Sequence, residues 1–320
     1  MNEDINTGMK YKLNSFFCGI GGFEIGFSKA GFEVIWANDF DKYAIQTYNA
    51  NFTQPAICQD LFTIPINNIP QSDVFTGGFP CQPFSMMGSQ NGFEDVRGTL
   101  FFRIAEIIQN QKAKGIHPKV IVLENVRRLL THDNGNTFAT IKSILEDLGY
   151  TVFYKVLNSA DFGVPQTRNR LFIVCFSDSR ARFSFPNPIP LQSTMQDILE
   201  SDVDAKYFLS ERILKTILAH GGGNYSAKSE IDLSIARPLT ATMAKMHRAC
   251  QDNYITQEKG IRRLTPRECA RLQGFPDSFI LPCSDTQLYK QFGNSVTSNV
   301  AYYLGKQIYR ALNGLEKYDA

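Results

Sequence analysis

The chain has 320 residues, of which 43% are hydrophobic and 20% charged, enough to form a core in one large domain or in a large and a small one. A formal net charge of +2 excludes neither nucleic acids nor small molecules as partners, because a near-neutral total can hide a local basic surface. The seven cysteines include no C-x-x-C pair and the four histidines show no metal-ligand spacing, so we expect an intracellular, reduced protein without a bound metal. No apolar run approaches the roughly 20 residues that span a bilayer.

The first half of the chain alternates strand and helix patterns. We predict strands over residues 12–17, 32–37, 73–76, 120–123, 151–156 and 170–176, and helices over residues 23–30, 41–49, 100–111 and 137–148. This alternation is typical of an α/β protein with a doubly wound, mostly parallel sheet. In such a sheet, ligands bind at the carboxyl ends of the strands.

The first predicted strand leads into a glycine-rich turn, Cys18-Gly19-Ile20-Gly21-Gly22. The turn lacks the G-x-G-x-x-G order of dinucleotide-binding loops and therefore does not indicate a pyrophosphate site. Asp39 follows about 20 residues later, as expected of an acid that accepts hydrogen bonds from ribose hydroxyls. Asp60 could read an adenine amino group, with the ring of Phe17 packed on the base. A nucleoside ligand without phosphates points to S-adenosylmethionine, whereas the glycines alone would indicate only a structural turn.

Cys81 lies in the segment Gly77–Ser85, between Pro80 and Pro83 and just after a predicted strand. The prolines stiffen the backbone on both sides of the cysteine, which suits the presentation of a nucleophile. Taken alone, an unpaired cysteine is more often a small buried hydrophobic residue. Residues 84–98 then form a long loop with three glycines, and loops of this length in compact domains are usually functional or disordered.

Three charged residues accompany later strands. Glu124 directly follows the predicted strand 120–123, where a carboxyl group is either a helix cap or a proton donor with a raised pKa, and the position alone favours the cap. Arg168 and Arg170 are spaced so that both side chains point to one side of an extended chain. Guanidinium groups aimed in one direction typically meet carboxylates, phosphates or a carbonyl oxygen.

The pattern changes after residue 185. Three prolines interrupt the alternation, and residues 221–225 and 236–242 are typical of short strands and loops, which predicts a second, smaller domain of mainly β and loop structure. Residues 237–273 contain eight Lys or Arg against three acids. This excess predicts a basic surface that neutralises phosphates, although a charge run is also typical of a solvated face. Residues 300–312 are predicted to return to the first domain as a closing helix.

Taken together, the motifs resemble those of the DNA (cytosine-5) methyltransferases, particularly the single-chain bacterial restriction-modification type. The matching runs occur in the family's order and nearly at its spacing, and they cover almost the whole chain except residues near 186–261: Phe17–Gly22, Gly78–Gln82, Glu124–Val126, Gln166–Arg170, Arg263–Arg271 and Gln291–Val296. One position departs from the pattern. Ser15 stands where family members usually carry an aspartate, which leaves one polar contact near the methionine moiety unassigned.

The resemblance implies a Rossmann-like, S-adenosylmethionine-binding catalytic domain formed by residues 1–185 and 263–320, and a target-recognition domain at residues 186–262. It further implies methyl transfer, without a metal, to carbon 5 of a cytosine flipped out of double-stranded DNA, in the bacterial cytoplasm. A cognate restriction endonuclease acting on the same site is a further expected partner. One chain that carries all the motifs is expected to work as a monomer.

The resemblance also assigns roles to individual residues. Cys81 is the expected nucleophile at carbon 6, Glu124 the proton donor to ring nitrogen 3, and Arg168 and Arg170 the groups that hold the base carbonyl and the local geometry, with direct base contact assigned to Arg170. The implied cofactor contacts are Phe17, Gly19, Ile20, Gly21, Gly22, Asp39, Phe40, Asp60, Leu61, Pro80, Asn294, Ser295 and Val296. The implied DNA contacts are Gln82, Ser85, Gln90 and Arg97 around a loop expected to close over the DNA, and Lys245 and Arg248 in loops that also hold His247, Gln251 and Asn253.

Alternative functions remain open at this point. A tRNA cytosine-5 methyltransferase of the same family shares the catalytic motifs, but residues 93–98 and the basic second domain favour DNA. A catalytically inactive DNA-binding module would be expected to lack Cys81 or Glu124, and both are present. A small-molecule methyltransferase would explain the glycine turn but not the cysteine loop.

Overall fold

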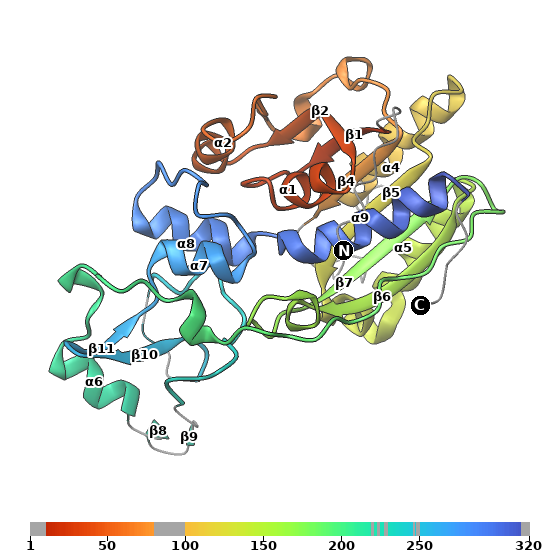
Figure 1. Cartoon of the computed structure of the whole chain (residues 1–320). Helices are drawn as coiled ribbons and strands as arrows, with labels where there is room; N and C mark the ends of the chain where they lie inside the picture. The colour runs from red at the N-terminus through yellow and green to blue at the C-terminus, as the bar shows by residue number, and fades with distance from the viewer. Residues whose placement is uncertain are drawn as a thin grey trace, which may run out of the picture. The chain divides into compact units, whose positions relative to one another are not determined.

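The computed structural model describes residues 11–79, 100–218, 221–222, 225–226, 230–245, 247 and 250–314, and Figure 1 shows their course. The chain divides into two compact units. Unit 1 comprises residues 1–157, 169–187 and 301–320, and unit 2 comprises residues 158–168 and 188–300, each as far as it is described. No helix in the described ranges is both long and apolar enough to cross a membrane.

Unit 1 is built on a seven-stranded sheet in the order β3-β2-β1-β4-β5-β7-β6. The strands are rich in β-branched and aromatic residues, as expected for a sheet that is covered on both faces. They are β1 (Tyr11–Phe16), β2 (Phe32–Asp39), β3 (Ile57–Cys58), β4 (Val74–Gly78), β5 (Val120–Val126), β6 (Thr151–Asn158) and β7 (Asn169–Phe176). The pairs from β3 through β5 are parallel, whereas β7 runs antiparallel to β5. The predicted mostly parallel α/β fold is therefore confirmed, with one reversed strand.

The register brings the functional segments to one edge of the sheet. Phe16, the last residue of β1, is paired with Gly77 of β4. Gly78, the next residue of β4, is paired with Glu124 of β5. The glycine turn after β1, the segment that leads to the cysteine loop, and Glu124 therefore all leave the sheet at the carboxyl ends of parallel strands, where ligands of such sheets bind.

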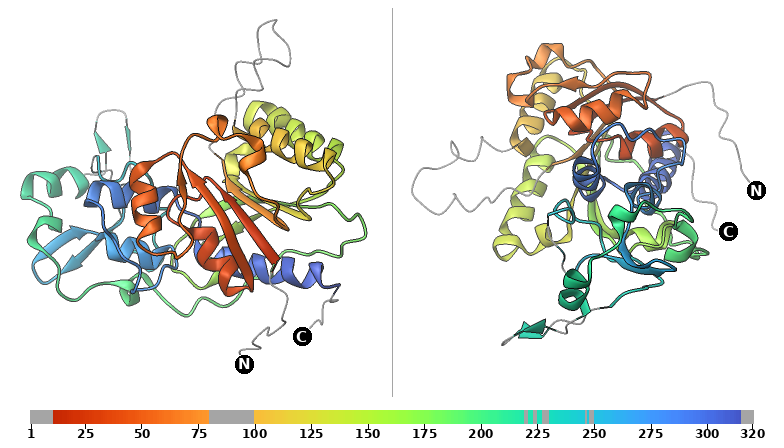
Figure 2. Two further views of the ribbon diagram at one scale, coloured as in Figure 1. Left: turned by 90° about the horizontal axis from the view of Figure 1, so that it is seen from above. Right: turned by 90° about the vertical axis from the view of Figure 1, so that its left-hand side faces the viewer.

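Helices cover both faces of this sheet, as the views in Figures 1 and 2 show. The helices of unit 1 are α1 (Gly22–Lys29), α2 (Lys42–Asn49), α4 (Leu100–Ala113), α5 (Asn136–Asp147) and α9 (Ser298–Leu312), the last of which begins in unit 2. Each lies within two residues of its predicted range. On one face, Gly305 of α9 lies close to Phe27 of α1, where an added Cβ would be 3.6 Å from the Phe27 ring.

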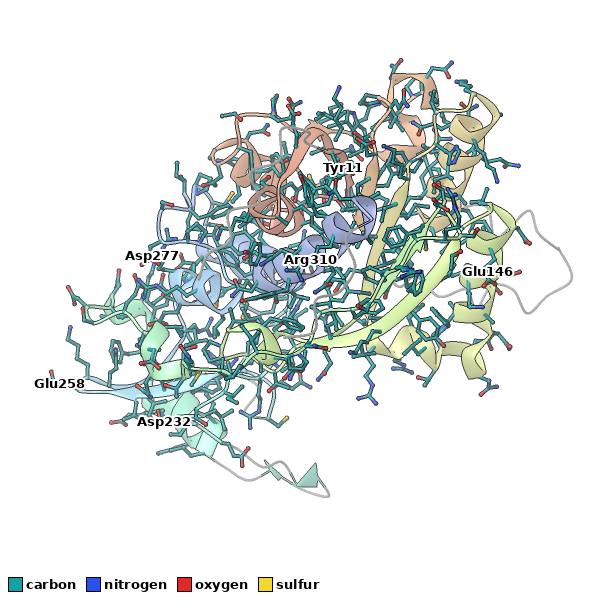
Figure 3. The ribbon with its side chains drawn as sticks, turned by 45° about the vertical axis from the view of Figure 1, so that its right-hand side comes forward. Tyr11, Glu146, Asp232, Glu258, Asp277 and Arg310 are labelled. Carbon is teal, nitrogen blue, oxygen red and sulfur yellow. The ribbon has the colours of Figure 1, made fainter. Side chains whose placement is uncertain are left out.

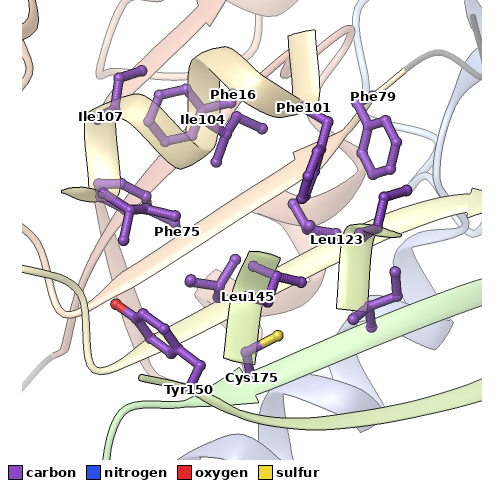
Figure 4. Packing of buried hydrophobic residues seen from close by; sticks show 14 of the residues in the cluster. Phe16, Phe75, Phe79, Phe101, Ile104, Ile107, Leu123, Leu145, Tyr150 and Cys175 are labelled. Atoms are coloured by element: carbon purple, nitrogen blue, oxygen red, sulfur yellow. The ribbon is translucent and has the colours of Figure 1, made fainter. Parts of the chain in front are cut away.

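The main hydrophobic core lies on the opposite face, beneath α4 and α5 (Figure 4). Phe16 of β1 packs against Phe75 of β4, with ring centroids 4.9 Å apart, and Ile104 of α4 and Leu145 of α5 join the same cluster. Full burial of each such side chain contributes about 1.5–3 kcal/mol. This core holds the strand ends rigidly, which a site built on their carboxyl edge requires.

Unit 2 contains short elements and several buried polar links. Its helices are α6 (Glu211–Leu218), α7 (Pro266–Leu272) and α8 (Asp285–Asn294), and its strands pair as β8 (Gly221–Gly222) with β9 (Tyr225–Ser226) and β10 (Tyr254–Gln257) with β11 (Gly260–Arg263). A fully buried ion pair joins Arg262 and Glu268 at 2.6 Å. Asp232, labelled in Figure 3, accepts hydrogen bonds from the backbone N–H and the hydroxyl of Thr256. Short strands were expected in this region, but α6 was not.

Short 3-10 helices complete both units: η1 (Leu61–Thr63), η2 (Ile66–Asn68), η4 (Arg127–Leu130), η5 (His132–Gly135), η6 (Ser159–Phe162), η7 (Met195–Ile198) and η8 (Ala205–Tyr207). The boundary between the two units does not coincide with the predicted domain boundary, since residues 158–168 and 263–300 pack within unit 2. The two units are defined by compact packing, which does not show which residues contact DNA. The assignment of residues 186–262 to target recognition therefore stays a prediction.

Candidate active site and cofactor-binding turn

The turn after β1 depends on backbone conformations that favour glycine. Gly19 and Gly21 have positive φ angles of 56° and 92°. An added Cβ at Gly21 would lie 2.2 Å from Cε2 of Phe52, whereas no heavy atom of the described residues lies within 4 Å of one built at Gly19. The backbone at Gly19 therefore faces open space, and a ligand can approach it closely.

Asp39 ties this turn to the end of β2. Its carboxylate accepts hydrogen bonds from the backbone N–H of Gly19 and of Asp41, each at 2.9 Å. Burial raises the pKa of Asp39, and the two backbone hydrogen bonds partly offset this rise. The structure thus brings together Gly19 and Asp39, which the sequence analysis assigned to one nucleoside site. Each carboxylate oxygen keeps a lone pair that can accept a further hydrogen bond.

Aromatic and acidic residues continue this region along the sheet edge. Phe40, directly after Asp39, leaves 70% of its surface exposed, although it is a large apolar side chain. Asp60 lies at the start of η1, where it accepts a hydrogen bond from the N–H of Phe62 at 3.0 Å. Phe17 is half-buried and has an unusual positive φ of 53° for a residue other than glycine. These side chains fit the chemistry of a ribose and a planar base.

A second set of groups lies at the end of β5. Oε1 of Glu124 is 3.1 Å from Nε of Arg170, which comes from the antiparallel neighbour β7. Both side chains are mostly buried, so this ion pair is less screened than a surface pair. A Cβ added at Gly78 would lie 3.4 Å from Oε2 of Glu124. A larger residue at position 78 would therefore crowd the carboxyl group.

Asn125, next to Glu124, connects this strand end to the segment before Cys81. Its Nδ2 donates to the carbonyl oxygen of Phe79 at 2.9 Å, and its Oδ1 accepts from the N–H of Val126 at 2.8 Å. The sequence analysis assigned no role to Asn125. The sequence signal that could have indicated such a role is its position between Glu124 and Val126, within a motif that matches the family. The amide fixes the backbone two residues before the predicted nucleophile.

Comparisons with known proteins identify the family of the chain. The family model described as C-5 cytosine-specific DNA methylase matches residues 11–310. The chain belongs to this DNA methylase family. The Type II methyltransferase M.SsoII of Shigella sonnei is 40% identical over 96% of this chain and 82% of its own length. The Type II methyltransferase M.NgoBI of Neisseria gonorrhoeae is 43% identical, over 90% of this chain and 89% of its own.

A solved structure extends the comparison to the fold. The Dnmt2 methyltransferase of S. pombe superposes with a TM-score of 0.80 at 21% identity, covering 95% of this chain and all of that one. At this identity the likeness concerns the fold alone. The family model and the relatives show that the chain is a C-5 cytosine DNA methyltransferase. The family and the enzyme class predicted from its motifs are therefore confirmed.

Arg168 and Arg170 of this methyltransferase have different surroundings, although their spacing predicted that both point the same way. Arg170 pairs with Glu124 in unit 1. Arg168 is 2% exposed and lies in unit 2, where its guanidinium donates to the carbonyl oxygens of Leu239, Gly293 and Ser295 at 2.8–3.0 Å. The strand β7 begins at Asn169, so Arg170 lies in the strand and Arg168 lies before it. These contacts suit a structural role for Arg168.

The remaining predicted cofactor residues divide between the two units. Ile20, Gly22 and Leu61 are buried in unit 1, with Gly22 opening helix α1. Asn294 ends helix α8 in unit 2 with an exposed side chain, Ser295 is buried and Val296 is half-buried.

Several predicted residues lie outside the described ranges: Pro80, Cys81, Gln82, Ser85, Gln90, Arg97 and Arg248. Of the recognition residues, Lys245 is described and is exposed. Asn253 is buried instead, and its amide bonds both the N–H and the carbonyl oxygen of Arg237, so it holds a loop rather than facing outward. Within the part of the chain that the structure describes, no group of His, Cys, Asp and Glu could hold a metal ion.

Much of the predicted basic excess in residues 237–273 serves unit 2 internally. Arg262 pairs with the buried Glu268, and Arg271 pairs with Asp277 at 2.7 Å. Arg263 lies 2.8 Å from Nε2 of His247, and burial together with this arginine lowers the pKa of His247. Among the described residues of this range, Lys245 and Lys259 are exposed.

Proposed function

We propose that this chain is a sequence-specific methyltransferase that transfers a methyl group from S-adenosylmethionine to carbon 5 of a flipped-out cytosine in double-stranded DNA. The observation that carries this proposal is the arrangement at the ends of β4 and β5. There the Glu124 carboxyl group is held by Arg170, and Asn125 fixes the backbone that leads into Cys81. The proposed proton donor and the segment that precedes the proposed nucleophile thereby belong to neighbouring strands of the sheet.

Residues around the glycine turn fit the cofactor. The open space at Gly19 admits a ligand to the backbone, Asp39 retains acceptor capacity for ribose hydroxyls, and the exposed ring of Phe40 offers a face to a base. Asp60 and Phe17 are proposed to contact the adenine, and Asn294, Ser295 and Val296 are proposed as further cofactor contacts. When bound, S-adenosylmethionine would supply an electrophilic methyl group on its sulfonium.

The protein groups make carbon 5 of the base reactive. Carbon 5 of cytosine is too weak a nucleophile to take the methyl group directly, so we assign the Cys81 thiolate to add at carbon 6 and supply an electron pair to the ring. Glu124 gives its proton to ring nitrogen 3, which spares the ring a negative charge. Arg170 orients the Glu124 carboxyl and is placed to contact the base. After methylation, loss of the carbon 5 proton to solvent restores the double bond and expels the thiolate, and ring nitrogen 3 returns its proton to Glu124.

The target base has to leave the duplex for these groups to reach it. We assign Gln82, Ser85, Gln90 and Arg97 to contact with the DNA from which the base is flipped. Lys245 and Arg248, within the proposed recognition domain at residues 186–262, would contribute to backbone and base contact. Residues 1–185 and 263–320 form the proposed catalytic domain.

The setting follows from the relatives. Their names as Type II methyltransferases support a restriction-modification role, in which a cognate endonuclease cuts the same sequence when it is unmethylated. The proposed enzyme works as a monomer in the bacterial cytoplasm. Transfer to tRNA is not favoured, because the matching family model describes DNA methylases.

The deciding test is base-resolution mapping of 5-methylcytosine in plasmid DNA from a methylation-free bacterial host that expresses the chain. The wild type should methylate one short recurring sequence, Cys81→Ser should methylate none, and Cys283→Ser, which changes a cysteine in unit 2, should resemble the wild type. Methylation by Cys81→Ser would exclude the covalent step. A soluble wild type that binds S-adenosylmethionine but leaves the DNA unmethylated would exclude DNA as the substrate, and RNA would be tested next.

A further inference from the structure

Two exposed arginines follow the proposed proton donor along the chain. Strand β5 ends at Val126, and the short 3-10 helix η4 begins with Arg127 and Arg128. Arg127 is three residues from Glu124, so their Cα atoms are at most about 11 Å apart. Both arginines belong to unit 1, as Glu124 does. They therefore lie at the sheet edge that carries the proposed active site.

Helix η4 is anchored in a way that directs both arginines outward. Its third residue, Leu129, is fully buried and belongs to the main core of unit 1. A 3-10 helix has three residues per turn, so the side chains of Arg127 and Arg128 are each rotated by about 120° from that of Leu129. The N–H of Thr131 donates to the carbonyl oxygen of Arg128 at 3.1 Å, which fixes the end of the turn. The two guanidinium groups thus diverge on the solvent side of a rigid segment.

The charges of these two side chains are not used inside the protein. Among the described residues, the guanidinium groups of Arg127 and Arg128 have neither an ion-pair nor a hydrogen-bond partner. Other arginines of unit 1 behave differently, since Arg103, Arg170 and Arg180 each pair with a carboxylate. Two adjacent positive charges repel each other, and an anion from outside the chain would offset this repulsion.

The DNA substrate supplies such an anion at this place. A flipped base stays covalently joined to its sugar and its flanking phosphates, because it turns out about the DNA backbone. A cytosine held at Glu124 therefore brings the phosphates of its own strand within one nucleotide of the carboxyl group. Guanidinium groups suit phosphate well, because their N–H donors match its oxygens in pairs.

We propose that Arg127 and Arg128 form a phosphate-binding site for the DNA strand that carries the target cytosine, on unit 1 and beside the proposed catalytic carboxyl group. This inference rests on the proposed function. Each arginine contacts one phosphate, and because the two side chains diverge from η4, the two phosphates are neighbours. Such contacts carry no direct sequence information and instead position the strand from which the base is flipped.

The test is the salt dependence of binding between the full chain and a fluorescent DNA duplex that contains the sequence methylated by the wild type. Each phosphate contact contributes about 0.9 to the slope of log affinity against log salt concentration. With counterion release as the whole contribution, Arg127→Gln and Arg128→Gln should each lower the affinity about 15-fold at about 50 mM salt and about fourfold at about 200 mM. The double variant should lower the slope by about 1.8.

Arg182→Gln is the matched control. It removes an exposed arginine beyond the end of β7, where this strand lies beside the start of β5 at the opposite edge of the sheet. It should keep the wild-type slope. Thermal unfolding checks that all variants fold, which we expect because the substituted side chains are exposed.

Further variants separate a phosphate contact from a base contact. Arg127→Lys and Arg128→Lys keep the positive charge and should keep the salt slope. Mapping of 5-methylcytosine should find the same target sequence in both glutamine variants as in the wild type, since a lost phosphate contact weakens binding about uniformly across sequences. Their methylation rate at saturating DNA should stay close to that of the wild type, because a lost contact of this kind affects bound substrate and transition state alike.

A wild-type slope in either Arg127→Gln or Arg128→Gln would overturn the two-phosphate site while leaving the proposed function intact. An equal loss in Arg182→Gln would also overturn it, because the effect would then come from net charge. A changed target sequence would show that the arginines read a base instead. If the wild type does not bind the duplex even at about 50 mM salt, where phosphate contacts are strongest, the proposed function fails as well.

Discussion

Oε1 of Glu124 lies 3.1 Å from Nε of Arg170, across the antiparallel pair formed by β5 and β7. The contact depends on the reversed direction of β7, because the start of this strand lies beside the end of β5. Arg170 therefore lies at the same edge of the sheet as Glu124. Glu124 is thereby held by a charged partner at the position from which we propose that it protonates the base.

Glu124→Gln should keep the fold but lower the methylation rate about 10²- to 10⁴-fold, the usual contribution of a general acid. Single-turnover methylation of plasmid DNA measures the rate, and calorimetry with S-adenosylmethionine checks that the cofactor still binds. Glu33→Gln, an exposed substitution of the same kind, should be unaffected. A Glu124→Gln protein of wild-type rate would remove Glu124 from the mechanism.

Replacing Asn125 should separate catalysis from cofactor binding. Asn125→Ala loses the hydrogen bonds to Phe79 and Val126, at a cost of about 1–3 kcal/mol in the free energy of unfolding. We expect roughly a hundredfold loss of methylation rate through misplacement of the cysteine segment. Asn125→Asp keeps the acceptor for Val126 and loses the donor to Phe79, so it should reproduce the rate loss. A slow Asn125→Ala with a normal Asn125→Asp would attribute the effect to the Val126 bond instead.

The two glycines of the turn should respond differently to alanine. Position 19 faces open space, so the methyl group of Gly19→Ala meets no atom of the described residues. The positive φ at this position strains an alanine by about 1–2 kcal/mol. The added methyl group also enters the proposed cofactor site. We expect modest destabilisation and at least about a tenfold loss of S-adenosylmethionine affinity, which corresponds to about 1.4 kcal/mol. Gly115→Ala, with a φ of 69° and equally open surroundings, is the control for strain and should leave affinity unchanged.

Gly21→Ala should instead act on folding, because its Cβ would meet the ring of Phe52. The double variant with Phe52→Ala should recover part of that loss in thermal unfolding. Equal stability of Gly19→Ala and Gly21→Ala would contradict this distinction.

Arg168 and Arg170 should differ in what they affect. Arg168→Met leaves the carbonyl oxygens of Leu239, Gly293 and Ser295 without this donor, which should lower the free energy of unfolding by about 3 kcal/mol or more. Arg170→Met, at a partly exposed site, should change stability less and methylation more. Urea unfolding and single-turnover rates, measured on both variants, test this contrast. Equal losses of stability and of methylation rate in the two variants would refute it.

Stability should depend on pH through Glu24. Its pKa is about 7 in the folded protein against 4.5 for an ordinary glutamate, so the folded state retains a proton that the unfolded state releases. The wild type should therefore lose stability relative to Glu24→Gln as the pH rises from about 4.5 to 7, by about 3 kcal/mol in total, and the difference should level off above that range. Urea unfolding from pH 5 to 8 measures it, and a constant difference would show that the carboxyl group titrates normally.

The order of the elements was predictable because its signals are local. Helix α1 was expected over residues 23–30 and is found at Gly22–Lys29, since the spacing of Phe23 and Phe27 and the positive φ of Gly31 are set within a few residues. The pairing of Gly19 with Asp39 was also foreseeable, because adjacent parallel strands end at the same edge of a sheet.

Contacts between distant segments decided the rest. The sequence by itself determined the family and the strand and helix order, because these depend on short-range patterns and motif spacing. Only the tertiary structure decided that Arg168 binds carbonyl oxygens in unit 2 and that Asn253 is buried. It also decided that Glu24 is buried without a hydrogen-bond partner among the described residues. A side chain's partners depend on which segments pack beside it, and that is a property of the whole fold rather than of its neighbours in the chain.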